Sequence, residues 1–403
     1  MCCNRASSRI NMGRLSWREE SVCSLVVMKT TLNLPQILRS AACGLACVAL
    51  AACSAPVAAP ATTPAQPANT TAPSAPTSQA DLSGIKTYLL DKTAALKAAT
   101  NDLKAVSDQY YELAKAAGFD YAALFAGNKA RVASLIEDAR AKWTVASPLY
   151  EQMEGIVAGT PSLAEFDVIL DAGASKEEDP ANPAPIDLTL LDGRVLEKPG
   201  NLFGVSESAL WGTFEAFRAK GEFDLNGDGK IEFGEALPDA NVLKGAVDTL
   251  AAQASKLADA AAQWTPTEAD AFTALVVMVP TMSEYFDSWK NSRFIQGEAS
   301  TQRDFVAISR LADIQDILGS LQVVHQNLSP LIQGVDKTQD EAIGKGLTDL
   351  KSFVANVHSQ EKGGKRFSPE DADTLGKEAQ DRADAIVGQV AQIAARLGIK
   401  IEQ

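Results

Sequence analysis

From Asp81 onward, apolar side chains recur at spacings of three, four and seven residues, and this period constrains the fold more than any other feature. Such spacing is typical of an amphipathic helix that buries one face. No segment sustains the period-two alternation of a half-buried strand. The first stripe comprises Ile85, Leu89, Leu96, Leu103, Val106, Tyr110 and Leu113, and the period returns in 129–157, 204–219, 241–263, 267–290, 303–327, 338–358 and 369–397.

Breaks between these segments are rich in glycine, proline and polar residues, as at 173–200 and 221–238. Helix starts carry local signals: Ser368 followed by Pro369 combines a capping hydroxyl with a proline at the first helical position. About eight helices joined by such breaks favour antiparallel packing. The sequence therefore predicts an all-α fold of two packed four-helix bundles.

The N-terminal region carries an export signal. Residues 41–52 form an apolar run behind Lys29 and Arg39, and the run is too short to span a bilayer. It ends in Leu50-Ala51-Ala52-Cys53, which resembles the lipobox of bacterial lipoproteins. We expect residues 1–27 to be a non-native extension, 28–52 a lipoprotein signal peptide, and Cys53 the site of lipidation.

Residues 53–80 are a Pro/Ala/Thr-rich tract that cannot bury a core, so we expect a tether there and a helical domain at 81–403. All six cysteines lie at or before Cys53, so the processed chain has no internal disulfide. Ser54 after the lipidated cysteine favours attachment to the outer membrane, facing the periplasm. In a cell without an outer membrane, the lipid would lie in the outer face of the cytoplasmic membrane.

The whole chain carries a formal net charge of −14, and its leader is basic, so the processed form is more acidic still. Such a surface repels nucleic acid and attracts cations. We therefore expect no nucleic-acid partner. The same acidity also keeps an exported protein soluble, and the two interpretations are compatible.

Residues 224–235 match the twelve-residue EF-hand loop, D-x-[DN]-x-[DN]-G-x5-E, at every position. Gly229 permits the sharp turn at the sixth position, and Ca²⁺ prefers about seven hard oxygens. The expected ligands are the side chains of Asp224, Asn226, Asp228, Glu232 and Glu235 and the backbone carbonyl of Lys230.

This loop has no second EF-hand with which to pair, and Pro238 follows closely, so its exiting helix should be short or broken. A lone loop between two bundle helices favours a stabilising role for Ca²⁺. A regulatory role remains the alternative.

Several stretches resemble the imelysin-like family, which includes EfeO-type periplasmic iron-uptake lipoproteins and alginate-binding relatives. Residues 85–103 are similar to the family's first helix, and 139–171 carry its Tyr-Glu-x-x-Glu pattern at Tyr150, Glu151 and Glu154. Residues 297–317 are similar to its Gly-Glu and Asp-Phe helix. The order of these stretches carries the resemblance, which implies a helical, metal-linked binding protein.

The family's G-x-H-x-x-E motif, followed by Leu-Trp, places a histidine and a glutamate on one helical face as metal ligands. Here Glu207 matches, followed by Leu210-Trp211, but Gly204 stands at the histidine position. The resemblance then leaves a possible all-carboxylate cluster, which suits Ca²⁺ or ferric iron better than Zn²⁺. The alternative is that these acids are solvated surface groups. The cluster would comprise Glu151, Glu154, Asp167 or Asp171, and Glu207.

No catalytic constellation is evident in 81–403, which lacks G-x-S-x-G and P-loop motifs and has only two histidines, His325 and His358. His358 and Glu361 spell H-x-x-E near a helix end, where a surface histidine is the simpler interpretation. We therefore expect no enzyme, and a degenerate metallopeptidase is the least favoured class.

The leading hypothesis is a membrane-tethered lipoprotein that binds Ca²⁺ and captures metal ions, iron in particular, or a metal-linked ligand for uptake, with an inner-membrane permease as a possible partner. The alternative is a structural or interaction lipoprotein with a degenerate metal site that binds a polysaccharide or protein.

Overall fold

The computed structural model describes residues 79–402, and the fold below refers to this part of the chain. The proposed extension at 1–27, the signal peptide at 28–52, Cys53 and the tether up to residue 78 lie outside it. Within the described residues, no helix combines the length and apolar character needed to cross a membrane.

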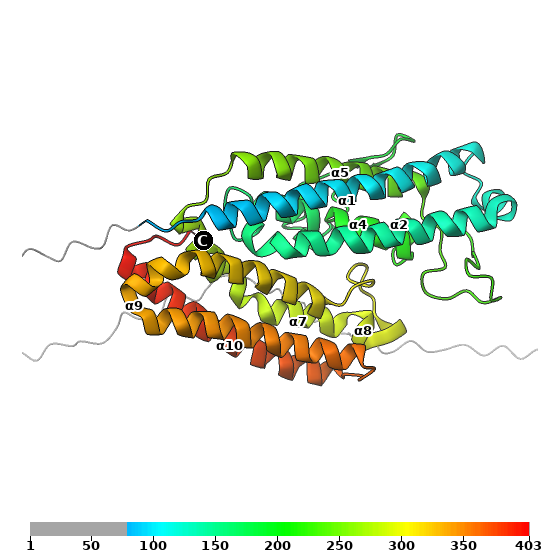
Figure 1. Ribbon diagram of the computed structural model, residues 1–403. Helices are drawn as coiled ribbons and strands as arrows, with labels where there is room; N and C mark the ends of the chain where they lie inside the picture. The colour runs from blue at the N-terminus through cyan, green and yellow to red at the C-terminus, as the bar shows by residue number, and fades with distance from the viewer. Residues whose placement is uncertain (1–78, 403) are drawn as a thin grey trace, which may run out of the picture. The chain divides into compact units, whose positions relative to one another are not determined.

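Four helices form the first bundle. α1 (Ser83–Ala116) packs against α2 (Tyr121–Val157) and α5 (Ala240–Gln263), and the short α4 (Leu202–Trp211) packs against α5 (Figure 1). Aspartates cap two of these helices. Asp120 accepts from the Ala123 N–H at the start of α2, and Asp239 accepts from the Asn241 and Val242 N–H groups at the start of α5. A cap of this kind satisfies backbone donors that the first turn leaves free.

The second bundle contains α6 (Glu268–Met278), α7 (Met282–Asn291), α9 (Arg310–Lys362) and α10 (Pro369–Leu397). The 3₁₀ turn Val279–Thr281, around Pro280, separates α6 from α7. α9 is itself a helical hairpin, because the extended backbone of Asp336 (φ −160°, ψ 102°) reverses its direction (Figure 1). Its two arms, α10 and the interrupted helix α6–α7 therefore make four helices, and the arms match the separate stretches 303–327 and 338–358 that the sequence predicted.

The two bundles meet where α2 packs against α9. Gly155 on α2 allows this contact, because a Cβ there would lie 2.5 Å from Ser320 Oγ and 2.9 Å from Leu321 Cγ. One continuous hydrophobic core then runs through both bundles. The fold class predicted from the sequence, two packed four-helix bundles, is confirmed.

A long connection between α2 and α4 positions acidic residues against the core. It contains α3 (Ala164–Asp167), a π-helical turn (Val168–Ala172) and the antiparallel strands β1 (Leu188–Thr189) and β2 (Val195–Leu196). π-Helical turns are rare and often occur at functional sites.

The remaining short elements are α8 (Arg293–Gln296) and 3₁₀ turns at Glu215–Phe217 and Gly297–Ala299.

Two predicted helices are shorter than the sequence pattern suggested. The 204–219 segment stops at Trp211, because Gly212 adopts a left-handed conformation (φ +69°) that ends the helix. The 303–327 segment begins at Arg310, after the cap residue Ser309. Residues 303–309 instead form a loop, in which three backbone N–H groups donate to the carboxylate of Glu207.

Candidate metal-binding sites

A group of buried carboxylates lies where the two bundles meet. Glu151 and Glu154 are three residues apart on α2 and therefore share one helical face. Asp171, in the π-helical turn, faces them, and one oxygen of each of these three side chains lies within 4.8 Å of the others. The structure thus brings together three of the four acids predicted to form a second metal site.

Two tyrosines hold this carboxylate group in place. Tyr285 Oη on α7 donates to Glu154 Oε1 at 2.7 Å, and Tyr150 Oη donates to Asp167 Oδ1 at 2.7 Å. Three other carboxylate oxygens are buried without a hydrogen-bond partner among the described residues: Glu151 Oε2, Glu154 Oε2 and Asp171 Oδ2. Buried oxygens of this kind are costly, because burial removes their water without replacing it. A bound cation would satisfy them.

Arg310, at the first turn of α9, is the counter-ion of the group. Its Nη1 donates to Asp313 Oδ2 at 3.1 Å and lies 3.8 Å from Glu151 Oε1 and 3.9 Å from Asp171 Oδ2. With Glu154 and Asp167, the ionised group would hold five carboxylates against one guanidinium, a balance of −4. The single arginine cannot neutralise it.

Burial raises the pKa of several of these carboxyl groups. The pKa of Asp167 rises to about 8, because of burial and the nearby Glu154, and that of Asp313 to about 6, chiefly because of burial, with Arg310 opposing the shift. Burial and neighbouring carboxylates also raise the pKa of Glu151 well above its usual range, and burial does the same for Asp171. Without a cation the group therefore retains protons near neutral pH. A cation that binds there would displace them.

The carboxylate group opens onto a cavity of about 500 Å³ between the bundles. α2 and the π-helical turn form one wall, and α7 and the loop before α9 form the other. Among the charged residues of the lining, one cation, Arg310, stands against six acids: Glu154, Asp167, Asp171, Glu178, Glu284 and Asp304.

Glu207 does not join this group, although the sequence predicted that it would. Its carboxylate accepts three backbone N–H groups of the loop before α9: Phe305 at 2.6 Å, Val306 at 2.9 Å and Ala307 at 2.8 Å. Burial raises the pKa of Glu207 to about 8, and these three donors oppose the shift. Glu207 therefore fixes the loop that leads to Arg310.

The space beside Gly204, where the imelysin-like motif places histidine, is occupied by another acid. A Cβ at residue 204 would lie 2.6 Å from Asp304 Oδ2. Asp304 is half-buried, and the loss of water around its carboxyl group raises its pKa. The structure thus has a carboxyl group where the motif would supply a nitrogen ligand.

The loop 224–235 has the internal hydrogen bonds of a compact ion-binding turn. Asp224 accepts from the N–H groups of Gly227 and Gly229, and Glu235 accepts from those of Asn226 and Glu232. Oxygens of Asp224, Asp228 and Glu235 lie within 4.8 Å of one another. Hard oxygens converging in this way fit the ligand preference of Ca²⁺.

The other predicted ligands of the loop lie at its surface. Asn226 Oδ1 accepts from the Asp228 N–H at 2.7 Å, while Lys230 and Glu232 are exposed. The ninth position of such loops often binds Ca²⁺ through water, which an exposed Glu232 allows.

Helices do not flank this loop directly, so the arrangement differs from a helix–loop–helix EF-hand. Residues 217–219 pair with 237–239 at its base, through Ala219 N–H to Leu237 O and Asp239 N–H to Phe217 O. The segment that follows the loop is therefore non-helical up to Asp239, as Pro238 predicted. The segment that precedes the loop is non-helical as well.

The loop contacts α2 in the first bundle and α8, which packs against α7 of the second. Lys129 on α2 pairs with Asp224 at 3.6 Å, and the guanidinium of Arg293 on α8 lies 3.7 Å from the ring centroid of Phe233. Arg140 on α2 donates to the carbonyls of Leu210, at the end of α4, and Gly234. Contacts to α2 and α8 make the loop a clip between elements distant in sequence.

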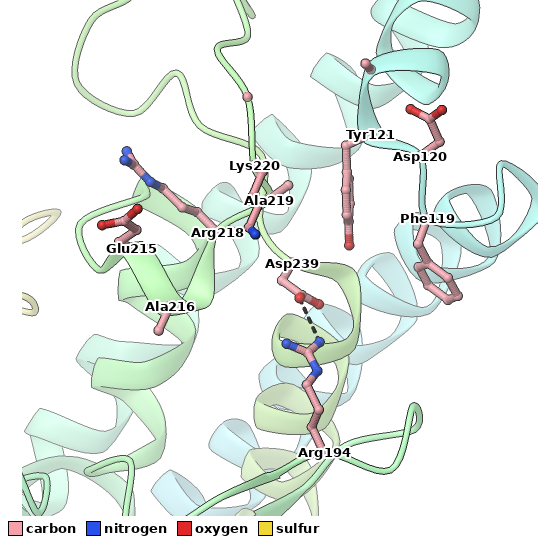
Figure 2. A pocket seen from close by; sticks show the side chains of 12 residues that line it. Phe119, Asp120, Tyr121, Arg194, Glu215, Ala216, Arg218, Ala219, Lys220 and Asp239 are labelled. Atoms are coloured by element: carbon pink, nitrogen blue, oxygen red, sulfur yellow. Dashed lines mark hydrogen bonds and ion pairs between the residues drawn. The ribbon is translucent and has the colours of Figure 1, made fainter.

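A second cavity, of about 630 Å³, lies between the start of α2 and the base of this loop (Figure 2). Tyr121 projects into it, and Arg194 pairs with Asp239 at 2.7 Å. Arg218 and Lys220 are exposed at its rim. Its lining balances three cations against three acids, unlike the acidic cavity.

The two histidines are engaged in packing contacts. His325 Nε2 lies 3.0 Å from Asp340 Oδ1 across the α9 hairpin, and His358 Nδ1 lies 2.8 Å from Gln315 Nε2. Glu361 accepts from Trp289 Nε1 at 2.6 Å. The H-x-x-E letters therefore do not form a metal site.

Sequence reasoning missed Arg310, Asp313, Asp304 and Tyr285 as parts of the site. One local signal was available: Arg310 and Asp313 are three residues apart at a helix start, within a stretch already singled out by its resemblance. Tyr285 carried no such signal, because its partner Glu154 is 131 residues away.

A comparison with protein-family models covers most of the described residues. A family model described as Imelysin, named among the peptidases, matches residues 85–393. The search of curated proteins found no significant match.

Proposed function

The chain belongs to the imelysin family, and from this premise we propose that it is a non-enzymatic binding protein of the cell envelope that captures a hard metal cation in its acidic cavity. The observation that carries the proposal is the set of three buried, unpartnered carboxylate oxygens on Glu151, Glu154 and Asp171. One carboxylate oxygen of each of these residues lies within 4.8 Å of the others, which suits a single ion. Oxygen-only ligands favour ions such as ferric iron over zinc.

Iron is the cargo that best fits this set of ligands in an exported protein. Lipid attached to Cys53 would hold the protein at a membrane, and the tract at 53–80 would give the domain reach. The captured ion would then pass to a partner such as an inner-membrane permease. The raised pKa values of the cluster support release, since mild acidification would favour protons over metal.

Peptidase activity, which the family's name suggests, has little support in the cavity. Its lining contains no histidine or cysteine that could bind a catalytic zinc or act as a base. The residue at the motif's histidine position is Gly204, and Asp304 fills the space beside it.

Calcium in the loop 224–235 would act as a structural clip. Asp224, Asp228 and Glu235 would supply carboxylate oxygens, with Asn226, Glu232 and the Lys230 carbonyl completing the set. Because the loop touches α2 and α8, binding there would stabilise the packing of both bundles.

A second candidate function is the binding of a polysaccharide or protein partner. The cavity beside Tyr121 favours it, because an aromatic ring beside exposed charged side chains such as Arg218 and Lys220 suits a polar ligand (Figure 2).

Calorimetric titration of metal-stripped processed protein with terbium(III), a hard luminescent cation, tests the main proposal. We expect one site that Glu235→Gln removes and a second that Asp171→Asn removes. Asp138→Asn, on the exposed face of α2, is the matched control and should leave both sites intact. A single site lost only in Glu235→Gln would reject metal capture in the cavity and favour the second candidate.

A further inference from the structure

The acidic cavity contains a feature that a site for a bare cation does not need. Arg310 lines its wall, buried among carboxylates, with its guanidinium 3.9 Å from the ring centroid of Phe305 and 4.8 Å from that of Tyr285. Its Nε has no hydrogen-bond partner among the described residues. Unpartnered groups of both signs therefore occur together, on Arg310 and on Glu154 and Asp171.

The size of the cavity also exceeds what an ion requires. One water molecule takes up about 30 Å³ of liquid, and a partly dehydrated metal ion is comparable. The cavity of about 500 Å³ falls within the range of small-molecule sites, about 300–1,000 Å³. A bare ion at Glu154 and Asp171 would leave most of this volume filled with water.

Charge leads to the same conclusion. A bare cation bound to Asp171 would lie close to Arg310 Nη1, which is 3.9 Å from Asp171 Oδ2, and the two positive charges would repel each other. A planar carboxylate, by contrast, matches the forked donors of a guanidinium. A ligand that combines a metal with carboxylates would complement both halves of the site.

We propose that the cavity binds a hard metal ion together with a small polycarboxylate chelator. Glu154 and Asp171 would contact the metal, and Arg310 would bind a carboxylate of the chelator. This inference rests on the proposed metal-capture function, because it names the chemical class of the ligand for the same cavity.

Two probes separate the chelate from the bare ion. The processed chain carrying Glu235→Gln, which removes the loop site, is titrated with ferric citrate and, separately, with terbium(III) chloride. Adding Arg310→Gln should weaken ferric citrate binding by about tenfold or more, because a charge-assisted hydrogen bond is lost. Terbium(III) binding should stay equal or become tighter, because a repelling charge is removed.

Arg310→Lys is the conservative variant and protects the test if Arg310→Gln fails to fold. It keeps the positive charge but loses the paired donors of the guanidinium. Ferric citrate binding should therefore weaken, while terbium(III) binding stays unchanged. Arg396→Gln, at an exposed arginine of α10, is the control and should alter neither. Circular dichroism melts confirm that each variant is folded.

The outcomes separate this inference from the function on which it rests. Weaker ferric citrate binding together with equal or tighter terbium(III) binding in Arg310→Gln supports the chelate, and equal weakening of both would overturn it. Equal strengthening of both, or no change in ferric citrate binding, would overturn the chelate and leave cation capture intact. Failure of both probes to bind the Glu235→Gln protein would reject cation capture itself.

Discussion

Replacing Asp167 with asparagine should change how the stability of the protein depends on pH. The substitution is nearly isosteric, and asparagine keeps an oxygen to accept the hydrogen bond that Tyr150 donates at 2.7 Å. It removes a buried carboxyl group whose pKa rises from 3.8 to about 8, through burial and the nearby Glu154. The effect of ionising this one group can therefore be isolated.

The sign follows from proton binding in the two states. Between about pH 4 and pH 8 the folded protein holds a proton on Asp167 that the unfolded chain has released, so stability falls as pH rises. One such proton is worth at most about 1.4 kcal/mol per pH unit. Neighbouring carboxyl groups share the proton and reduce this value. We expect wild type to lose about 2 kcal/mol more than Asp167→Asn between pH 5 and 7.

Urea denaturation followed by far-ultraviolet circular dichroism, in the presence of a chelator, measures this difference at pH 5, 6 and 7. Asp138→Asn, at an exposed position of α2, serves as control and should run parallel to wild type. If Asp167→Asn also runs parallel to wild type, the buried carboxylates do not hold protons as argued, and the account of the site is wrong.

Three further predictions concern other parts of the molecule. Glu207→Gln should destabilise the fold by about 1–3 kcal/mol in urea denaturation, because the amide nitrogen cannot accept the Phe305 N–H, yet it should leave terbium(III) affinity in the cavity unchanged. Saturation of the loop with Ca²⁺ at a hundredfold excess over the dissociation constant should stabilise wild type by about 2.7 kcal/mol, and Glu235→Gln should abolish that gain in thermal melts. Gly204→His should lower the melting temperature without creating a zinc site in calorimetry, because Asp304 Oδ2 already occupies the space beside residue 204.

Local sequence information was enough to define most of the helices. The stretch 369–397 coincides with α10, because Ser368, Pro369 and Asp371 form a capping start that depends only on adjacent residues. The periodic spacing of apolar residues likewise predicted the two arms of the α9 hairpin as separate helices, on either side of the turn at Asp336. These features follow from contacts one helical turn apart.

The misplaced start of α9 depends on a distant partner. Nothing in residues 303–309 indicates that their backbone donors bind Glu207, which is 98 residues before Phe305 in the chain. A prediction based on the apolar pattern alone therefore extended the helix across this loop.

The candidate sites divide in the same way. The candidate calcium loop is contiguous, so the spacing of its expected ligands is visible in the sequence. The pair Glu151 and Glu154 is visible because one turn of helix brings the two together. The packing of α2, the π-helical turn and α9 places Asp171 and Arg310 beside this pair. Glu207 lies outside the group, because it binds the loop before α9. Sequence determined the elements and the local ligand sets, because these depend on neighbours along the chain. The tertiary structure alone decided which charges share the cavity, since burial and contact across bundles are properties of the packed chain.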